Sequence, residues 1–480
     1  MQTEVDPDGR LDGATLRLRS DVTVDASGDA LRLACPVGTF ALRAVAPRVV
    51  AALRSFDGTA RAVGDAADGL TEPEARQLWT ILRRLSDLFV HRIESHGRPL
   101  VEVEVTRRHA RYEPASLAVG TPVRLSRFAL LRTHAGALVL ESPLSGHRFT
   151  LLDAAAVAAA GALGGRYTAG EPVAGVNRPV MEKLLGHLVG AGLAEAGRSD
   201  GDVHVFPSDE DDTLRQWEFH DLLAHSRSRV GGFDQPLGAV FAHRDRIGPQ
   251  PAVRPLPEGG AIPLHRPDLD AVAADDPALG TVLEGRRSLR AYGEQPMTAE
   301  QLGEFLYRTA RVRGRRGPTA STPYETTSRP YPSGGGVHDL ELYLSVRRCA
   351  GVEPGVYGYD PVGHRLVLVN GDPRDLAAMV GSAATGIGFL AEPDVVLTVT
   401  SRFQRLSWKY RAIAYSLALK HVGVLYQTMY LVATAMRLAP CALGSGDSEL
   451  AARVLGLDPL EEPAVGEFLL GSRPAPVPGA

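Results

Sequence analysis

The 480-residue sequence has little of several features that would indicate particular classes of protein. It has three cysteines, Cys35, Cys349 and Cys441, which are far apart and form no CxxC pair, so we expect neither a disulfide framework nor a bound metal. No apolar run reaches the roughly 18 residues of a membrane-spanning helix, and the polar N-terminus lacks the apolar core of a signal peptide. These absences predict a cytoplasmic protein that neither enters nor binds a membrane.

Charge of one sign and the common nucleotide-binding motifs are also missing. The net charge of −4 gives no basic field, so we expect no nucleic-acid partner. No GxGxxG, GxSxG or HExxH pattern occurs. Gly381–Gly386 has the glycine spacing of a phosphate-binding loop, but Ile387 stands where the lysine is required. The sequence therefore excludes the usual Rossmann and P-loop sites.

The first 200 residues contain what reads as a degenerate duplication. Segments 31–42 and 138–151 each predict two short strands around a Pro/Gly turn, and an amphipathic helix follows each, at 74–89 and 178–189. Hairpin-and-helix units of this order resemble winged helices, and we place one in residues 1–118 and a second in residues 119–200. Neither helix is rich in Lys or Arg, so peptide docking or a scaffold role is favoured over DNA binding.

Residues 201–268 read as a linker. An acidic break, Asp209–Asp212, is followed by the aromatic and charged segment Trp217–Arg229. The Pro-rich stretch from Pro249 to Pro267 predicts an extended strap laid over a surface, because proline disfavours helices and cannot complete a sheet ladder.

Residues 269–480 predict an α+β domain, with helices and antiparallel-type strands mixed along the chain. We expect helices at 279–285, 298–309 and 375–380, and a long helix from about 411 to 438. Strands are expected at 340–347, 355–359, 366–369, 394–400 and 468–471.

Two stretches of this domain have the composition of ligand-binding segments. The first combines guanidinium groups and a hydroxyl that can grip a phosphate, in Arg286, Arg287, Ser288 and Arg290. The second places small residues after prolines, which lets the backbone approach a flat ligand, in Pro332, Ser333, Gly334 and Gly335. Taken singly, the first reads better as a solvated basic patch, and the second reads equally well as a flexible turn.

Two further stretches lie on either side of the long helix. Lys409 and Tyr410 set an amine next to a phenol, a pairing suited to proton transfer when it is partly desolvated. A Gly-rich helix exit, able to present backbone N–H groups to an aromatic cofactor, is predicted at Leu443, Gly444, Ser445 and Gly446. Alone, the first also reads as a surface turn and the second as an ordinary helix end.

The linear order of these four stretches, closed by Leu470–Arg473, resembles the nitroreductase superfamily. Segments 329–338 and 355–360, together with Lys409-Tyr410, are similar to its SagB/ThcOx branch, the FMN-dependent azoline dehydrogenases of thiazole- and oxazole-containing peptide biosynthesis. The resemblance covers residues 270–480 and extends upstream through Trp217–Arg229. The two N-terminal modules are similar to the peptide-recognition domains of longer members.

The resemblance implies a function and a set of roles. An FMN cofactor would accept a hydride from a thiazoline or oxazoline ring, with Lys409 and Tyr410 as the proton-transfer residues. Arg286, Ser288 and Arg473 would hold the FMN phosphate, and Ser333, Gly334 and the backbone of Gly444–Gly446 would lie against the flavin. It further implies a homodimer, a precursor peptide with a leader sequence as client, and a cyclodehydratase as partner.

One departure from the wider superfamily puts a role in doubt, and three other functions stay open. Many relatives carry an acidic residue early in the long helix, where this chain has Leu419–Gly423, so a role in that stretch is in doubt. An NAD(P)H-dependent nitroreductase or quinone reductase would share the fold. A non-catalytic scaffold of a cyclodehydratase complex would keep it without turnover. A winged-helix flavoprotein regulator would need salt-sensitive DNA binding.

Overall fold

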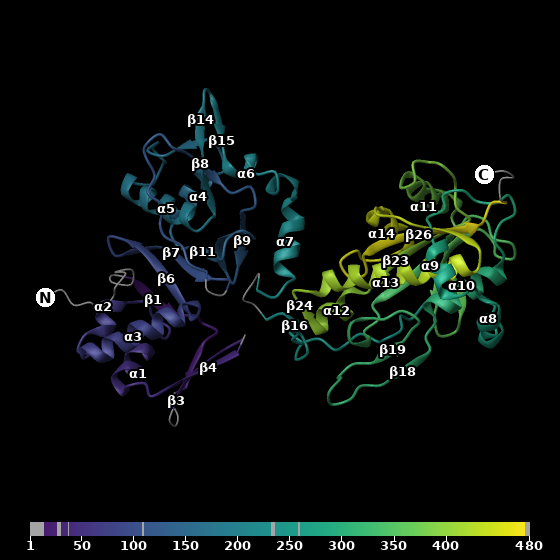
Figure 1. Ribbon diagram of the computed structural model, residues 1–480, viewed down its shortest axis with the longest axis horizontal. Helices are drawn as coiled ribbons and strands as arrows, with labels where there is room; N and C mark the ends of the chain where they lie inside the picture. Colours follow the sequence, from purple (N-terminus) through teal and green to yellow (C-terminus); the bar gives the residue numbers. More distant parts are fainter. Residues whose placement is uncertain are drawn as a thin grey trace. The chain divides into compact units, whose positions relative to one another are not determined.

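The computed structural model describes residues 14–25, 30–36, 38–107, 110–231, 236–257 and 260–475. The chain divides into two compact units, Met1–Leu237 and Gly238–Ala480, which Figure 1 colours purple to teal and green to yellow. Each unit has its own hydrophobic clusters, and each is described separately below.

The N-terminal unit is built on a seven-stranded antiparallel sheet in the order β5-β1-β6-β7-β11-β10-β9. Its strands are β1 (Thr15–Leu18), β5 (Arg61–Ala62), β6 (Phe89–Ser95), β7 (Arg98–Val105), β9 (Leu130–His134), β10 (Ala137–Glu141) and β11 (His147–Leu151). Smaller sheets are formed by β2 (Thr23–Asp25), β3 (Ala30–Cys35) and β4 (Gly38–Arg43), by β8 (Pro122–Leu125), β12 (Tyr167–Thr168) and β13 (Ala194–Ala196), and by β14 (Arg198–Asp200) and β15 (Val203–Val205).

Helices of this unit lie on both sides of the predicted boundary between modules. The first group contains α1 (Pro47–Arg54), α2 (Val63–Ala67), α3 (Glu72–Arg84) and η1 (Ser86–Leu88). The second contains α4 (Ala154–Ala162), α5 (Arg178–Gly190), α6 (Pro207–Glu210), η2 (Leu214–Gln216) and α7 (Phe219–Arg227). The helices predicted at 74–89 and 178–189 correspond to α3 and α5. Each starts with an N-cap residue, Thr71 or Asn177, followed by proline in the first turn.

The two predicted modules share one sheet. Strand β7 of the first pairs with β11 of the second, from His147 opposite Val105 to Leu151 opposite Val101. Buried residues of β6 and β7, such as Ile93 and Val101, belong to the same hydrophobic cluster as α4 and α5. Sequence patterns set the individual strands, but the pairing across the boundary joins residues 42 or more apart and has no local signal.

The C-terminal unit centres on a second seven-stranded antiparallel sheet, in the order β17-β22-β21-β20-β23-β26-β25. Its strands are β17 (Ala261–Pro263), β20 (Leu340–Val346), β21 (Gly355–Asp360), β22 (Arg365–Asn370), β23 (Val395–Ser401), β25 (Leu438–Ala442) and β26 (Ala464–Ser472). Two small ribbons pair β16 (Gly238–Ala239) with β24 (Tyr410–Arg411), and β18 (Gly314–Arg316) with β19 (Thr326–Ser328).

Helices cover both faces of this sheet (Figure 1). On one face, α10 (Ala299–Ala310) and α13 (Ala414–Ala435) pack with Leu342, Leu397 and Phe468 of the strands. On the other, α11 (Pro373–Thr385) and α14 (Ser448–Leu455) pack with Val356, Val396 and Leu469. The remaining helices are α8 (Leu269–Asp275), α9 (Leu279–Gly285), η3 (Gly334–Gly336) and α12 (Phe403–Lys409). The α+β class predicted for this domain is confirmed.

One predicted location in this unit is wrong. The long helix ends at Ala435 instead of Leu438, and β25 follows it. The run Leu443–Gly446 therefore follows a strand that pairs with β26, and it leads into α14. Pro440 disfavours a continued helix through residues 438–443, and the pairing with β26 makes Leu438–Ala442 a buried strand.

Among the residues that the structure describes, no helix has both the length and the apolar character needed to cross a bilayer.

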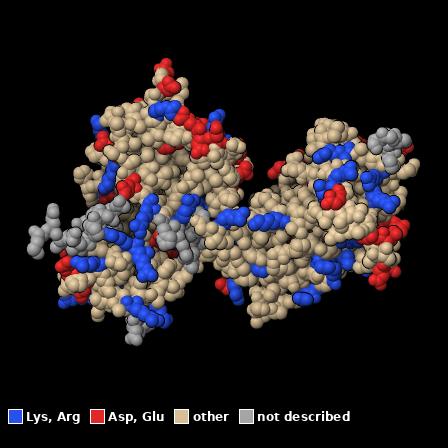
Figure 2. All heavy atoms as spheres, in the orientation of Figure 1, with Lys and Arg blue, Asp and Glu red and all other residues tan. Residues whose placement is uncertain are grey.

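Figure 2 shows acidic side chains gathered around α6. There Asp209 and Glu210 continue into Asp211 and Asp212, the acidic break read from the sequence.

Candidate functional site

The predicted residues of the C-terminal unit fall into two clusters beside α13. The first contains the arginine-rich segment that follows α9. Ser288 Oγ lies 2.7 Å from the hydroxyl of Tyr430 on α13, and that hydroxyl also accepts a hydrogen bond of 2.8 Å from the N–H of Ala442. The guanidinium of Arg286 lies 5.3 Å from the centre of the Tyr430 ring. Tyr430 thus fixes the segment against β25.

Arg473 joins the same cluster from the C-terminal strand. The N–H of Gly293 donates to the carbonyl of Ser472 at 3.0 Å, so the chain after Arg290 runs beside Ser472 and Arg473. Arg286, Arg287, Arg290 and Arg473 form no ion pair with a carboxylate in the described part of the chain. Four arginines on two neighbouring segments, without acidic partners among the described residues, make this end suited to a phosphate.

The second cluster surrounds the side chain of Lys409, which is 9% exposed. Its ammonium donates a hydrogen bond to the hydroxyl of Tyr324 and lies 4.8 Å from the ring centres of both Tyr324 and Tyr410. Tyr324 in turn donates to the carbonyl of Gly335 at 2.9 Å. The predicted pair Lys409-Tyr410 and the glycine run Gly334–Gly335 are therefore brought together.

The extended segment after Gly238 holds Lys409 in place. Lys409 is the last residue of α12, and the N–H groups of Val240 and Phe241 donate to its carbonyl at 3.0 and 3.1 Å. The indole N–H of Trp408 donates to the carbonyl of Ile247 at 2.6 Å. Part of the segment that the sequence assigned to a linker and strap therefore forms one wall of this cluster.

The surroundings of Lys409 favour its charged form. Burial lowers the pKa of the amine, but the hydrogen bonds and charge interactions with Tyr324 and Tyr410 outweigh that effect, and the pKa is raised above its ordinary value. Base catalysis by a lysine needs the opposite direction, because the free amine must be present near neutral pH. Lys409 is thus an ammonium that donates to phenol oxygens.

A buried histidine and a buried carboxylate hold the backbone of the glycine run at Gly334. Neither residue was predicted from the sequence. The N–H of Gly334 donates to Nε2 of His421 at 2.8 Å, and Nδ1 of His421 lies 2.6 Å from Asp339. Because a backbone N–H can only donate, Nε2 must be an acceptor and Nδ1 carries the proton. Asp339 also accepts from Ser401 Oγ at 2.6 Å. His421 lies within 419–423, the stretch of the long helix whose role was in doubt from the sequence.

The backbone around this cluster is strained. His338, Ala412 and Phe241 have φ values of 42°, 66° and 53°, a region that residues with a side chain seldom adopt. Gly335 has φ 60°. Such strain persists only where the surrounding structure holds it, and it concentrates at functional sites.

Gly335→Ala tests how closely the glycine approaches the amine. A Cβ at Gly335 would lie 1.9 Å from Lys409 Nζ and 2.9 Å from the Tyr410 hydroxyl. Because Nζ is the far end of a flexible side chain, we expect the fold to survive while the amine moves, and activity to fall by about 10²-fold or more, as when a proton-transfer group is lost. Circular dichroism and turnover are measured together. Gly381→Ala, in open space on α11, should change neither the circular dichroism spectrum nor turnover. A fully active Gly335→Ala would contradict the assignment of Gly335 and Lys409 to the functional site.

The run Leu443–Gly446 lies against a buried carboxyl. Leu443 is buried while Gly444, Ser445 and Gly446 are exposed. A Cβ on Gly446 would lie 2.0 Å from Glu467 Oε2, so only glycine fits there. Burial, aided by the nearby charge of Asp447, raises the pKa of Glu467 to about 7.

Glu467 should make stability fall as pH rises. The folded state keeps the proton up to about pH 7, whereas the unfolded state releases it near 4.5, so the unfolded state binds fewer protons between those values and the free energy of unfolding drops. Glu467→Gln should remove up to about 3 kcal/mol of that drop. Urea unfolding at about pH 5 and pH 8 measures it, with the exposed Glu449→Gln as control. An unchanged pH dependence in Glu467→Gln would contradict this origin.

The two clusters lie toward opposite ends of α13. His421 and Tyr430 are nine positions apart on that helix, which is about 13 Å along its axis at the helical rise per residue. Pro332, Ser333, Gly334 and Gly335 belong to the Lys409 cluster, and Arg286, Arg287, Ser288, Arg290 and Arg473 belong to the Tyr430 cluster. Leu443–Gly446 follow β25, whose residue Ala442 contacts Tyr430.

Known families match both units of the chain. Residues 283–471 match the nitroreductase family, and residues 123–234 match the cyanobactin oxidase ThcOx. Residues 283–471 therefore form a nitroreductase-family domain, and the chain is an oxidoreductase of this class. Its resemblance to the ThcOx branch is confirmed by the second match, which covers most of the second N-terminal module and the segment Trp217–Arg229.

Individual relatives align with the C-terminal part. A nitroreductase-type protein of Methanocaldococcus jannaschii, MJ1384, is 29% identical over 187 residues, which are 39% of this chain and 86% of that protein. A nitroreductase-type structure from Ralstonia eutropha is 22% identical, covering 48% of this chain and all of that one, with a TM-score of 0.36. One chain of the E. coli microcin synthetase McbBCD complex, with truncated pro-MccB17 bound, is 20% identical, covering 40% and 72%, with a TM-score of 0.33.

Proposed function

We propose that the chain is an FMN-dependent dehydrogenase that oxidises thiazoline or oxazoline rings of a ribosomally made precursor peptide to thiazoles or oxazoles. The observation that carries this proposal is the placement of the Lys409 ammonium between the phenols of Tyr324 and Tyr410, directly beside Gly335. The ThcOx match supports the ring-oxidising branch over the rest of the nitroreductase family.

The residues present fit FMN in their chemistry. Arg286, Ser288, Arg290 and Arg473 supply forked and hydroxyl donors without acidic partners among the described residues, as a phosphate needs. Gly335 has no side chain of its own, so its backbone can approach a flat ring on the side away from Lys409. Gly444 likewise has nothing within 4 Å of an added Cβ. When bound, FMN would accept the hydride removed from the azoline ring.

The chain itself would carry the proton chemistry. Aromatisation also removes a proton from the ring, so a proton acceptor must lie within hydrogen-bond reach. Because Lys409 is held as an ammonium, we assign the acceptor to the oxygen of Tyr410 in its phenolate form, whose negative charge Lys409 stabilises until the ring proton neutralises it. Tyr324 and the His421–Asp339 pair act as positioning residues: Tyr324 holds the amine, and His421 holds Gly334.

The N-terminal unit would bind the leader sequence of the precursor peptide, and a cyclodehydratase would make the azoline rings upstream. Edge strand β9 offers unpaired backbone groups to which an extended peptide can add. The ThcOx match, which begins at residue 123, includes this strand.

We also propose a homodimer through α13 and α9. Helix α13 is apolar nearly all round, which is typical of a helix covered on every side. Yet Tyr415, Leu419 and Val424 are exposed on it, and Leu279 and Leu283 are exposed on α9, which contacts α13. An apolar surface spread over two adjacent helices indicates a protein interface.

An NAD(P)H-dependent reductase of small molecules is the second candidate, favoured by the alignment with the nitroreductase-type relative. It differs from the proposed function in its electron donor, because NADH or NADPH, and not an azoline ring, would reduce the flavin.

The proposed function is tested by cofactor retention together with product formation. Purified protein should hold FMN and remove two hydrogen atoms from a synthetic thiazoline peptide, seen by mass spectrometry. The double variant Arg286→Gln, Ser288→Ala should lose most of the flavin on gel filtration, whereas the exposed Arg374→Gln should keep it. Protein without flavin absorbance even after incubation with FMN would overturn the proposal.

A further inference from the structure

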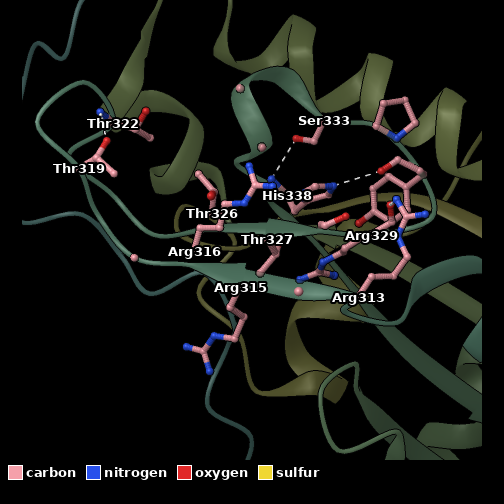
Figure 3. Close-up of a pocket in the computed structure, with 17 residues that line it drawn as sticks. Arg313, Arg315, Arg316, Thr319, Thr322, Thr326, Thr327, Arg329, Ser333 and His338 are labelled. Carbon is pink, nitrogen blue, oxygen red and sulfur yellow. Dashed lines mark hydrogen bonds between the residues drawn. The ribbon is translucent and has the colours of Figure 1, made fainter.

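A basin of about 800 Å³ opens beside the glycine run Ser333–Gly336. Its outer wall is the hairpin β18–β19 and its inner wall is the chain from Arg329 to His338 (Figure 3). Four arginines, Arg313, Arg315, Arg316 and Arg329, line it together with threonine and serine hydroxyls. Within the described residues no Asp or Glu lines it.

Two of these arginines keep an uncompensated positive charge. Arg315 is paired with Glu325 at 2.6 Å. The guanidinium of Arg313 donates to the carbonyl of Arg329 at 2.5 Å, and Arg316 is exposed on the hairpin. Neither Arg313 nor Arg316 forms an ion pair with any described residue. The basin therefore has the charge of an anion-binding site.

The floor of the basin holds buried polar atoms without partners. Arg329 is 4% exposed and donates through Nη1 to the carbonyl of Leu340 at 3.2 Å, while its Nε and Nη2 have no partner among the described residues. Thr327 Oγ1 is buried and unpartnered in the same way, whereas the unpartnered His338 Nδ1 is an acceptor, because Nε2 of that ring donates to the carbonyl of Tyr331 at 3.1 Å. Burial of such groups is unfavourable unless an acceptor reaches them. The nearby carboxyl of Glu341 offsets the charge of Arg329, so Arg329 contributes donors and not net charge.

The basin borders the Lys409 cluster at Gly335. Gly335 lines the basin, and the same residue lies against Lys409 Nζ and the Tyr410 hydroxyl. A molecule whose reacting ring lies at Tyr410 can therefore reach past Gly335, so that the atoms on one side of the ring lie in the basin.

We propose that this basin binds a carboxylate of the same peptide whose ring is oxidised, either an acidic side chain close to the ring or the C-terminal carboxylate. The inference rests on the proposed function, since it takes its ligand to be a peptide. Bidentate contact with Arg313 or Arg316 and acceptance from the donors at the floor give such a carboxylate its affinity. The chain would thereby select rings that have a negative charge on one side.

Three synthetic thiazoline peptides test this with the FMN-loaded enzyme. They are identical except that one has a Glu beside the ring and an amidated C-terminus, one has Gln and a free C-terminal carboxylate, and one has Gln and an amide. We expect KM for at least one acidic peptide to be about tenfold below that of the neutral peptide, a typical contribution of a charge-assisted hydrogen bond. The preferred peptide identifies the source of the carboxylate.

Variants separate the basin from the rest of the site. The double variant Arg313→Gln, Arg316→Gln should raise KM for the preferred acidic peptide about tenfold, leave kcat within about twofold, and leave the neutral peptide unaffected. Arg374→Gln, exposed on α11, should change nothing. Equal KM values for all three peptides with wild-type enzyme, or an equal effect of the double variant on acidic and neutral peptides, would overturn the proposal.

Binding of fluorescently labelled versions of the peptides, followed by anisotropy, separates the two possible failures. Oxidation without discrimination between the peptides removes the basin proposal and keeps the proposed function. Binding that discriminates and depends on Arg313 and Arg316, but without oxidation, keeps the basin as a carboxylate site and removes the dehydrogenase. Absence of both oxidation and discriminating binding removes both.

Discussion

Replacing Lys409 with methionine, or Tyr410 with phenylalanine, should lower the rate of azoline oxidation by about 10²- to 10⁴-fold, the usual contribution of a positioned proton-transfer group. Tyr410→Phe removes the oxygen that accepts the ring proton. Lys409→Met removes the charge that stabilises that oxygen while keeping an unbranched side chain of similar length. Bound FMN should remain in both variants, because the arginine cluster that holds its phosphate lies at the other end of α13.

The measurement is kcat for a thiazoline peptide, with the flavin content of each variant determined in parallel. Lys420→Met is the matched control for Lys409→Met, since Lys420 is exposed on α13 and its replacement should leave kcat unchanged. Tyr324→Phe should give a smaller loss than Tyr410→Phe, because Tyr324 holds the amine without touching the substrate. Wild-type rates in Lys409→Met and Tyr410→Phe would contradict the catalytic assignment even if the protein binds FMN.

Asp339→Ala should have the largest effect on stability. Asp339 is fully buried and accepts hydrogen bonds of 2.6 Å from both His421 Nδ1 and Ser401 Oγ. Its removal leaves two buried donors unpaired, which costs about 3 kcal/mol at 1–3 kcal/mol for each unsatisfied group. His421 would then be free to turn, so the N–H of Gly334 would lose its acceptor and the glycine run its position.

Urea unfolding of the C-terminal unit, followed by tyrosine and flavin fluorescence, measures this loss. Asp372→Ala removes an exposed helix N-cap on α11 and should lower the free energy of unfolding by only about 1 kcal/mol. His421→Gln should destabilise less than Asp339→Ala, since glutamine keeps a polar group near both partners. If Asp339→Ala were no more destabilising than Asp372→Ala, the buried pair would not support the site.

The sequence predicts most of the C-terminal fold because its signals are local. Helix α10 begins at Thr298, whose side chain accepts from the N–H of Gln301 while Gln301 reaches back to Thr298, and such a capping box is visible in the sequence. The strands predicted at 340–347 and 394–400 correspond to β20 and β23, which are buried along their whole length. Strand β25 was not predicted, because it is short and its strand conformation depends on pairing with β26.

The residues of the candidate site also divide into those that a local sequence signal reveals and those that it does not. Lys409 and Tyr410 were found because they are adjacent in sequence, and Ser333–Gly335 because glycine runs have a conformational signature. Tyr324, Asp339 and His421 were not found, because each meets its partner across more than ten residues and no spacing rule connects them. The charge state of Lys409 also required the structure, since it depends on two phenols that the fold places around one amine.

The central claim is that an azoline ring, and not a nicotinamide, delivers the electrons, and one spectrum tests it most directly. Enzyme loaded with FMN is mixed with a thiazoline peptide in the absence of oxygen, and the flavin absorbance is followed. The proposed function predicts that the absorbance bleaches with the thiazoline peptide alone, that thiazole product appears in equal amount, and that Tyr410→Phe bleaches far more slowly. A spectrum that stays unchanged with the thiazoline peptide but bleaches with NADH or NADPH would contradict the account.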